Sequence, residues 1–324
     1  MTGSHPSPHL LVTSAGAKLP LLRAAQEAVR RIDPDSCVIA ADQNSLVPAR
    51  YGVEAFWPTP DLESMGVEVL IRACRDRGIG WVLPTRDAEL AFWAGARAAF
   101  SEAGIEVIVS DPAGIDLCSD KLAFAQTLVQ QGLGAIPAAL SPEAFRPCPL
   151  VVKERFGAGS INLGLRLGEQ AALAHAAGLE APVFQPFVEG REISIDGWMD
   201  RRGRPHGLVL RRRDLVRGGE SQITTTFSHA GLEDQARAAF AALHLRGPAV
   251  MQAILDEEGE ALRIIECNAR FGGASTTAIA VGLDLIFWSL IESRTGVAPP
   301  FSRSPGQVRQ VRWPTDLILH DPDL

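Results

Sequence analysis

A chain of 324 residues is longer than one ordinary hydrophobic core supports, so we expect two or three domains. Hydrophobic residues make up 46% of the chain and charged residues 21%, as in soluble globular proteins, and the net charge of −7 argues against a nucleic-acid partner. Apolar stretches are interrupted before the roughly 18 residues that a membrane span needs, and the start of the chain lacks the pattern of a signal peptide. The five cysteines show no CxxC pair, which fits reduced thiols better than disulfides or a zinc site. We expect a soluble cytoplasmic protein.

The first third of the chain alternates short apolar runs with amphipathic helical patterns. This alternation predicts a parallel sheet with helices on both faces, so residues 9 to about 112 read as a doubly wound α/β domain. We expect strands at 10–13, 37–41, 81–83 and 106–109 and helices at 19–31, 64–76 and 87–103.

The turn after the first strand, Ser14-Ala15-Gly16-Ala17, raises the question of a dinucleotide site. The turn lacks the GxGxxG spacing, and Asp42 after the second strand is the one supporting feature. We favour a tight strand-to-helix turn that can still touch a small substrate, and an NAD(P)-dependent reductase is a distant alternative.

The pattern changes after this domain. A helix at 122–131 and a proline-rich loop precede strands at 150–153 and 165–167, a helix at 168–177 and a strand at 183–187. Beyond them, strands at 192–199, 207–210, 223–227, 249–256 and 261–266 and a helix at 232–243 predict an antiparallel sheet with one covering helix. We expect domains at 1–112, 113–186 and 187–324, α/β at the start and α+β in the catalytic part.

Oxygen-bearing side chains gather at the last two of these strands. The segment 256–260 is turn-like, and a hairpin closing there makes Gln252 and Glu266 cross-strand neighbours. Asn268 projects from the same face, whereas Cys267 points to the opposite face and packs in the core. Three oxygen ligands suit Mg²⁺, and Arg270, next in the alternation, could neutralise a transferring phosphate. The alternative is that Glu266 and Asn268 merely end a strand before a Gly-Gly turn.

Two lysines and a glycine-containing loop are candidates for phosphate contacts. Lys153 ends an apolar strand, and Lys121 begins a helix after Ser119-Asp120. In the loop, Gly157, Gly159 and Ser160 allow backbone N–H groups to face phosphate oxygens. Taken singly, each lysine reads as a solvated charge and the loop as a hairpin; together they indicate a polyphosphate site.

These features, in this order, resemble the ATP-grasp superfamily and, within it, stand-alone proteins similar to the carbamoyl-phosphate-synthase large subunit. The resemblance runs from about residue 9 to residue 290, and its most specific part is IIECNARFGG with Gln252 fourteen residues before Glu266. It implies an ATP-grasp fold with an N-terminal doubly wound parallel α/β domain, a small lid domain and a C-terminal antiparallel-sheet domain. The turn after the first strand would then face the acceptor substrate.

The resemblance also assigns roles to residues. Gln252, Glu266 and Asn268 would hold Mg²⁺, or Mn²⁺ in its place, and Arg270 would face the γ-phosphate of ATP. The phosphates would lie against Lys121 and Lys153 under the lid formed by Gly157, Gly159 and Ser160. Lys153 and Arg270 would be the catalytic residues.

The segment QPFVEGRE resembles the hinge of the family. Gln185 and Phe187 would offer backbone groups to adenine, and Glu192 would take the ribose hydroxyls. Val151, Phe187 and Ile265 would be apolar walls for the base. One departure is the sequence Lys153-Glu154-Arg155, where related chains often read Lys-Pro.

An arginine-rich stretch, Arg211 to Glu220, bears on the second substrate. On a strand, Arg211 and Arg213 share a face that Arg212 does not. By the resemblance this stretch lines the cleft beside the transferred phosphate, and we expect Arg213 and Arg217 to bind an acidic substrate. The alternative is a solvated basic surface.

The resemblance implies an ATP-dependent, ADP-forming ligase that joins a small carboxylic acid to an amine or another nucleophile through an acyl phosphate. Two alternatives stay open: phosphorylation of bicarbonate or carbamate, and a non-catalytic Mg-ATP-binding protein. The expected partners are ATP, the acid and the nucleophile, with no nucleic acid and no membrane; a homodimer is one option for the assembly.

Overall fold

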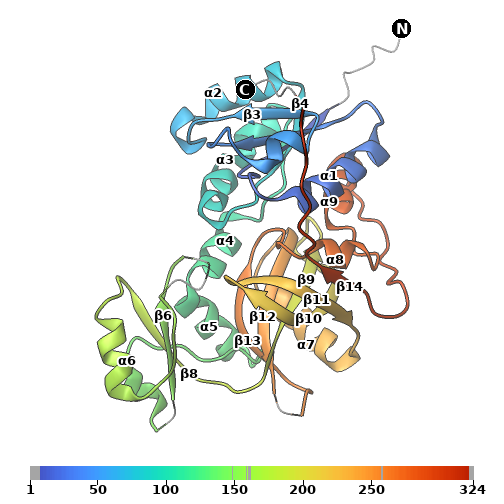
Figure 1. Ribbon diagram of the computed structural model, residues 1–324. Helices are drawn as coiled ribbons and strands as arrows, with labels where there is room; N and C mark the ends of the chain where they lie inside the picture. The colour runs from blue at the N-terminus through green and yellow to red at the C-terminus, as the bar shows by residue number, and fades with distance from the viewer. Residues whose placement is uncertain (1–7, 148, 158, 160–161, 257, 321–324) are drawn as a thin grey trace.

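The computed structural model describes residues 8–147, 149–157, 159, 162–256 and 258–320, which form three β-sheets with their covering helices (Figure 1). The N-terminal α/β unit lies at one end of the molecule in Figure 1, and the six-stranded and three-stranded sheets lie side by side at the other. None of the described helices is long and apolar enough to cross a membrane.

The N-terminal sheet has five parallel strands in the order β3-β2-β1-β4-β5. Its strands are β1 (His9–Val12), β2 (Val38–Asp42), β3 (Ala55–Pro58), β4 (Ile79–Leu83) and β5 (Glu106–Val107). Its helices are α1 (Leu19–Ile32), α2 (Val67–Asp76) and α3 (Leu90–Glu102), with 3-10 turns η1 (Pro48–Tyr51), η2 (Glu63–Met65) and η3 (Asp87–Glu89). In α1, Leu21, Leu22, Ala25, Ala28 and Val29 recur at helical spacing and are buried, as expected of residues that share one face of a helix.

A small antiparallel sheet follows, in the order β7-β6-β8. Its elements are β6 (Leu150–Glu154), β7 (Gly164–Leu167), β8 (Pro182–Pro186), the covering helix α6 (Glu169–Ala176) and the 3-10 turn η4 (Pro142–Phe145). Helices α4 (Pro112–Ser119) and α5 (Lys121–Gln130) connect the N-terminal unit to it (Figure 1). This sheet has a core of its own, built on Leu150, Val152 and Phe184 with two alanines of α6.

The third sheet is antiparallel, in the order β13-β12-β9-β10-β11-β14. Its strands are β9 (Arg191–Met199), β10 (Pro205–Arg217), β11 (Glu220–Phe227), β12 (Gly247–Leu255), β13 (Leu262–Asn268) and β14 (Arg309–Val311). Its helices are α7 (Ala230–Ala241), α8 (Thr276–Ile279) and α9 (Leu285–Thr295). Each of the three sheets lies within one of the predicted segments 1–112, 113–186 and 187–324, and we propose these segments as the domains.

The first and last long helices pack against each other. One apolar cluster joins Leu22 and Val29 of α1 to Ile286 and Leu290 of α9 and reaches Trp198 of the six-stranded sheet. At its rim, Trp81 Nε1 donates to Ser293 Oγ at 2.8 Å. The N-terminal unit is therefore fixed to the C-terminal part of the chain.

Several elements were not predicted. The parallel edge strand β3 and the strand β14 are only four and three residues long. The helices α4 and α9 do not separate apolar from polar residues onto two faces, and in α9 most residues are buried. The strands β10 and β11 also extend beyond the expected ranges, because the arginine-rich stretch continues as a hairpin. These elements have weak local sequence patterns; the strands are held by pairing with neighbouring strands, and α9 is held by packing in the apolar core.

Candidate active site

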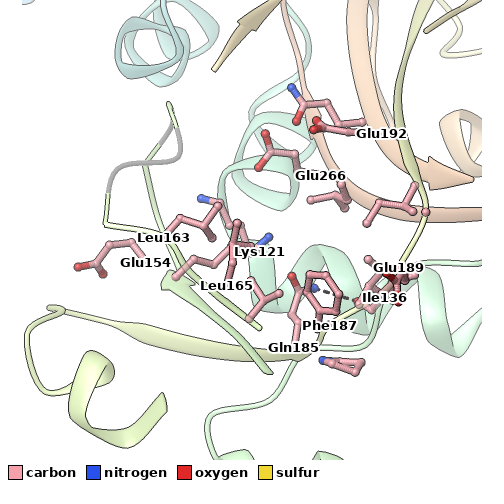
Figure 2. Close-up of a pocket in the computed structure, with 18 of the residues that line it drawn as sticks. Lys121, Ile136, Glu154, Leu163, Leu165, Gln185, Phe187, Glu189, Glu192 and Glu266 are labelled. Atoms are coloured by element: carbon pink, nitrogen blue, oxygen red, sulfur yellow. Dashed lines mark hydrogen bonds between the residues drawn. The ribbon is translucent and has the colours of Figure 1, made fainter. Parts of the chain in front are cut away.

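A cavity of about 620 Å³ lies between the small sheet and the six-stranded sheet. Apolar side chains, including Ile136, Val151, Phe187 and Ile265, form part of its wall, and polar side chains form the rest. Figure 2 shows Glu192 and Glu266 on the side of the six-stranded sheet, Lys121 in the middle, and Phe187 and Gln185 on the opposite side. The cavity therefore has the size and the mixed polarity of a site for a small ligand.

Gln252 and Glu266 are directly paired across β12 and β13, which confirms the predicted hairpin. With its amide oriented to satisfy both neighbours, Gln252 donates to Glu266 Oε1 at 3.3 Å and accepts from Arg213 at 3.0 Å.

Asn268 lies opposite Val250, two residues further along β13, and is half-buried like Glu266. Cys267, between them, is buried in the core. The candidate metal ligands are the carboxylate oxygens of Glu266 and the amide oxygens of Gln252 and Asn268, and Mg²⁺ binds oxygen ligands of both kinds. The described part of the chain contains no group of three or more His, Cys, Asp or Glu that could hold a metal ion, so a metal site here would need the amide oxygens of Gln252 and Asn268.

A register shift at this point shapes the cavity wall. Gln252 pairs with Glu266 but Ala253 pairs with Ile264, so β13 carries one extra residue, Ile265. Strict alternation would send Ile265 and Glu266 to opposite faces, yet both line the cavity. The bulge thus places an apolar wall next to a carboxylate.

Two lysines reach the cavity from the other side. Lys153 is buried and makes no ion pair among the described residues; burial, opposed by the nearby Glu266, lowers its pKa to about 8. Lys121 Nζ donates to the carbonyl of Gly157 at 2.6 Å, and burial lowers its pKa, again opposed by Glu266. A polyphosphate would supply the negative charge that these ammonium groups lack.

The segment just before the glycine loop is held in place by hydrogen bonds between Arg155 and Asp120. Asp120 caps α5 by accepting from the N–H groups of Leu122 and Ala123, and Arg155 binds the same carboxylate at 2.8 and 2.5 Å. Gly157 and Gly159 have φ of 94° and 84°, which favour glycine. Ser160 lies outside the described residues.

The predicted hinge is partly engaged within the fold. The Gln185 side chain is buried and donates to the carbonyl of Ile136 at 3.0 Å, so it braces the wall. The N–H of Phe187 donates to the carbonyl of Pro149 at 2.7 Å, so this one donor is engaged within the fold, and a role of the Phe187 backbone in holding adenine stays a prediction. The next residue, Val188, also lines the cavity, and its N–H makes no hydrogen bond within the described chain. Sequence reasoning missed Val188 because local pattern does not show which amides the neighbouring strand uses.

Glu192, which lines the cavity, forms an ion pair with Arg213. Arg213 donates to Glu192 at 2.7 Å and to the carbonyl of Gly219 at 2.6 Å. Burial raises the pKa of Glu192, although Arg213 lowers it. Arg213 therefore joins Glu192 to the β10–β11 turn.

Arg217 lies at the exposed tip of the β10–β11 hairpin and does not line the cavity. The turn that follows it approaches the glycine loop: a Cβ at Gly219 would lie 3.8 Å from the carbonyl oxygen of Gly159. Arg217 is therefore close to the lid but apart from the walls, and its substrate role stays a prediction.

Arg270 pairs with a residue 183 positions away. Its guanidinium donates to Asp87, at the start of η3, at 2.9 and 2.5 Å. This pair brings the carboxyl end of the N-terminal sheet next to the end of β13, where Glu266 and Asn268 lie. The negative charge of Asp87 also favours the protonated form of Lys121 and so raises its pKa. Asp87 had no distinguishing sequence pattern.

A buried network lies beside the site. Arg211 and Asp196 form an ion pair with both side chains buried, Arg211 also donates to Thr224, and Ser275 donates to Asp196. Arg212 on the opposite face bonds to Gln307, which confirms the predicted alternation. Because Ser275 accepts from the N–H of Gly272 at 3.0 Å, the network anchors the loop after Arg270.

We expect Asp196→Ala to destabilise the fold by about 3–5 kcal/mol, because it leaves the Arg211 guanidinium buried without a counter-ion. Urea unfolding measures this loss. The double variant Asp196→Ala with Arg211→Met should regain much of it, and Arg212→Met, at the surface of the same strand, should cost far less. Equal losses for Asp196→Ala and Arg212→Met would contradict the prediction.

The turn after β1 is closed against a dinucleotide. Gly16 N–H donates to Asp42 Oδ2 at 2.8 Å, so the carboxylate that could hold a ribose is bound to the turn. This geometry argues against the NAD(P) alternative.

Two family models match the chain. One, described as "PylC-like, N-terminal domain", covers residues 10–108, and the other, described as "ATP-grasp in the biosynthetic pathway with Ter operon", covers residues 179–316. No curated protein matches the sequence.

Solved structures share the fold over most of the chain. A biotin carboxylase from Campylobacter jejuni is 17% identical, with a TM-score of 0.73 over 93% of this chain and 74% of that one. An L-amino acid ligase from Bacillus licheniformis is 18% identical, with a TM-score of 0.65 over 90% and 75%. N5-carboxyaminoimidazole synthetase from Staphylococcus aureus, complexed with ADP, is 16% identical, with a TM-score of 0.68 over 91% and 79%. With its N-terminal parallel sheet, lid sheet and antiparallel sheet, the chain belongs to the ATP-grasp superfamily.

Proposed function

We propose that the protein is an ATP-dependent, ADP-forming ligase that joins a small carboxylic acid to an amine or another nucleophile. The observation that carries the proposal is the cavity itself: Gln252 and Glu266 face it from one sheet, and the buried, uncompensated Lys153 faces it from another. The similar structures point the same way, since they are described as biotin carboxylase, amino acid ligase and carboxyaminoimidazole synthetase.

Each part of the cavity has a role in this proposal. The adenine ring lies between Val151, Phe187 and Ile265, and the N–H of Val188, which has no acceptor among the described residues, donates to its edge. Glu192, held by Arg213, accepts from the ribose hydroxyls. Lys121 exchanges its bond to Gly157 for a phosphate oxygen, and Lys153 needs no such exchange because it has no ion-pair partner among the described residues.

Gln252, Glu266 and Asn268 would hold Mg²⁺, which when bound neutralises charge on the β- and γ-phosphates. The same oxygen ligands would also accept Mn²⁺.

The reaction then requires positioning more than covalent help from the protein. A carboxylate oxygen of the acid attacks the γ-phosphorus, the bond to the β-phosphate oxygen breaks, and ADP leaves. The nucleophile attacks the acyl carbon, loses its proton and displaces inorganic phosphate. The glycine loop from Gly157 onward, anchored by Arg155 and Asp120, excludes water from the acyl phosphate.

A screen of ADP and phosphate release over amino acids and small carboxylates tests the proposal. We expect release that requires both Mg²⁺ and one class of organic acid. Release with bicarbonate alone would instead support carboxyl-phosphate chemistry, and tight ATP binding without ADP formation across the panel would show a binding protein.

A further inference from the structure

The short strand β14 places two side chains against the loop that follows Arg270. It pairs with β11 at the edge of the six-stranded sheet and lies next to α8 (Figure 1). Because alternate residues of a strand share a face, Gln310 and Arg312 lie on one side and Arg309 on the other. Arg309 is exposed, whereas Gln310 and Arg312 are half-buried.

All three nitrogens of the Arg312 guanidinium have partners within the fold. Nε donates to the carbonyl of Ser221 at 3.1 Å, Nη2 donates to the carbonyl of Gly273 at 3.2 Å, and Nη1 pairs with Glu220 at 2.9 Å. Glu220 and Ser221 begin β11, and Gly273 lies three residues after Arg270. Arg312 therefore joins the β10–β11 hairpin to the loop that carries Arg270.

Gln310 holds the far end of the same loop. Its amide oxygen accepts from the hydroxyl of Thr276, at the start of α8, at 3.0 Å and also contacts the hydroxyl of Thr277. From the interior, Ser275 ties the loop to the buried Asp196. The loop is thus held from inside by Ser275 and from outside by the half-buried face of β14.

Two glycines, Gly272 and Gly273, make the loop depend on these contacts, because glycine gives the backbone more conformations to choose from. The approach of Arg312 is close: a Cβ at Gly273 would lie 2.9 Å from Nη2. The guanidinium therefore occupies the space that a side chain at Gly273 would need.

We propose that Arg312 is a positioning residue for phosphoryl transfer, because it fixes the loop from which the Arg270 guanidinium extends. Asp87 holds that guanidinium from the N-terminal unit, and Arg312 holds its backbone from β14. The inference rests on the proposed function and on the role at the γ-phosphate that the resemblance implies for Arg270.

The effect of Arg312 is expected on the transfer step and not on ATP binding. None of the described residues that line the nucleotide cavity belongs to β14 or to the segment 270–277. Transfer depends on geometry, and a displacement of about 1 Å caused by a distant substitution can cost about 10²-fold in rate.

The kinetic test compares Arg312→Gln with Arg309→Gln, which removes a cation from the exposed face of the same strand. ADP formation gives kcat and the KM for ATP, and thermal unfolding shows that both variants are folded at the assay temperature. We expect Arg312→Gln to lower kcat by about 10²-fold and to leave the KM for ATP within about twofold of the parent. Arg309→Gln should keep both values.

Gly273→Ala tests the contact from its other side. Its methyl group displaces the Arg312 guanidinium, so the variant should show the same loss of kcat. Because both changes break one contact, the double variant with Arg312→Gln should be no slower than either single variant.

A second readout does not require activity. Arg270 Nε donates to Asp87 at 2.9 Å, and its ¹⁵N NMR signal can be identified by its loss in Arg270→Lys. Exchange of the Nε–H proton with water reports how often this bond opens. We expect it to become at least about tenfold faster in Arg312→Gln and to stay unchanged in Arg309→Gln.

Parental exchange at Arg270 in Arg312→Gln overturns the inference, as does a parental kcat. A loss confined to the KM for ATP overturns it too, and so do losses that multiply in the double variant. If the parent forms no ADP with any acid, the proposed function has failed, and the Arg270 signal alone then decides whether Arg312 holds Arg270 in place.

Discussion

Replacing Glu266 by Gln together with Asn268 by Ala is expected to abolish Mg-dependent ADP formation, with a loss of at least about 10³-fold. The double change removes the carboxylate charge and one amide oxygen from the face that also carries Gln252. A metal ion at a phosphate contributes several kcal/mol of charge stabilisation, and about 4 kcal/mol corresponds to roughly 10³ in rate. ADP formation is measured at saturating ATP over a range of Mg²⁺ concentrations.

The matched control is Glu258→Gln, which removes an exposed carboxylate from the turn between the same two strands. It should retain full activity. Thermal unfolding of the double variant should stay close to that of the parent, since both side chains are only half-buried. Unchanged turnover in a folded double variant would rule out the metal assignment.

Replacing Lys153 by Met should weaken ATP binding by about 100-fold and at the same time stabilise the fold. The loss of affinity follows from removing a desolvated cation that a phosphate would compensate, an interaction worth about 2–3 kcal/mol. ATP binding is measured by calorimetry at pH 7. A variant that binds ATP as tightly as the parent would remove Lys153 from the phosphate site.

The gain in stability has a defined pH dependence. The pKa of Lys153 is about 8 in the folded chain against an ordinary value of 10.5, so between these values the unfolded chain binds more protons and stability rises with pH. Below pH 8 the full penalty, about 3 kcal/mol, is present. Lys153→Met should therefore raise the free energy of unfolding most at pH 7 and least near pH 10.5. Arg202→Met, at an exposed turn, should change neither binding nor stability.

The parts of the site that depend on spacing along one strand or one hairpin could be predicted from the sequence. Gln252 and Glu266 are neighbours because a short turn closes a hairpin, and Cys267 is buried because strand residues alternate. The positions of Lys121 and Lys153 follow from the ends of a helix and a strand, which local patterns also mark.

The parts that depend on distant contacts could not be predicted. Arg270 meets Asp87 across 183 residues, and no local pattern indicates such a pairing. Ile265 faces the cavity because of one extra residue in β13. At the hinge, the carbonyl of Pro149, just before the neighbouring strand β6, takes the N–H of Phe187. The N–H that makes no hydrogen bond within the described residues is therefore that of Val188.

The packing of α1 on α9 has a mechanical consequence. Because the N-terminal unit and the six-stranded sheet share continuous apolar clusters, we expect them to move as one unit, whereas the small sheet keeps a core of its own. Any opening that admits ATP is then expected to be carried by residues 150–186 alone, while the opposite wall of the cavity stays still. A spin-label or fluorophore pair between α6 and α7 would report that motion, and a pair between α1 and α9 would remain silent throughout the catalytic cycle.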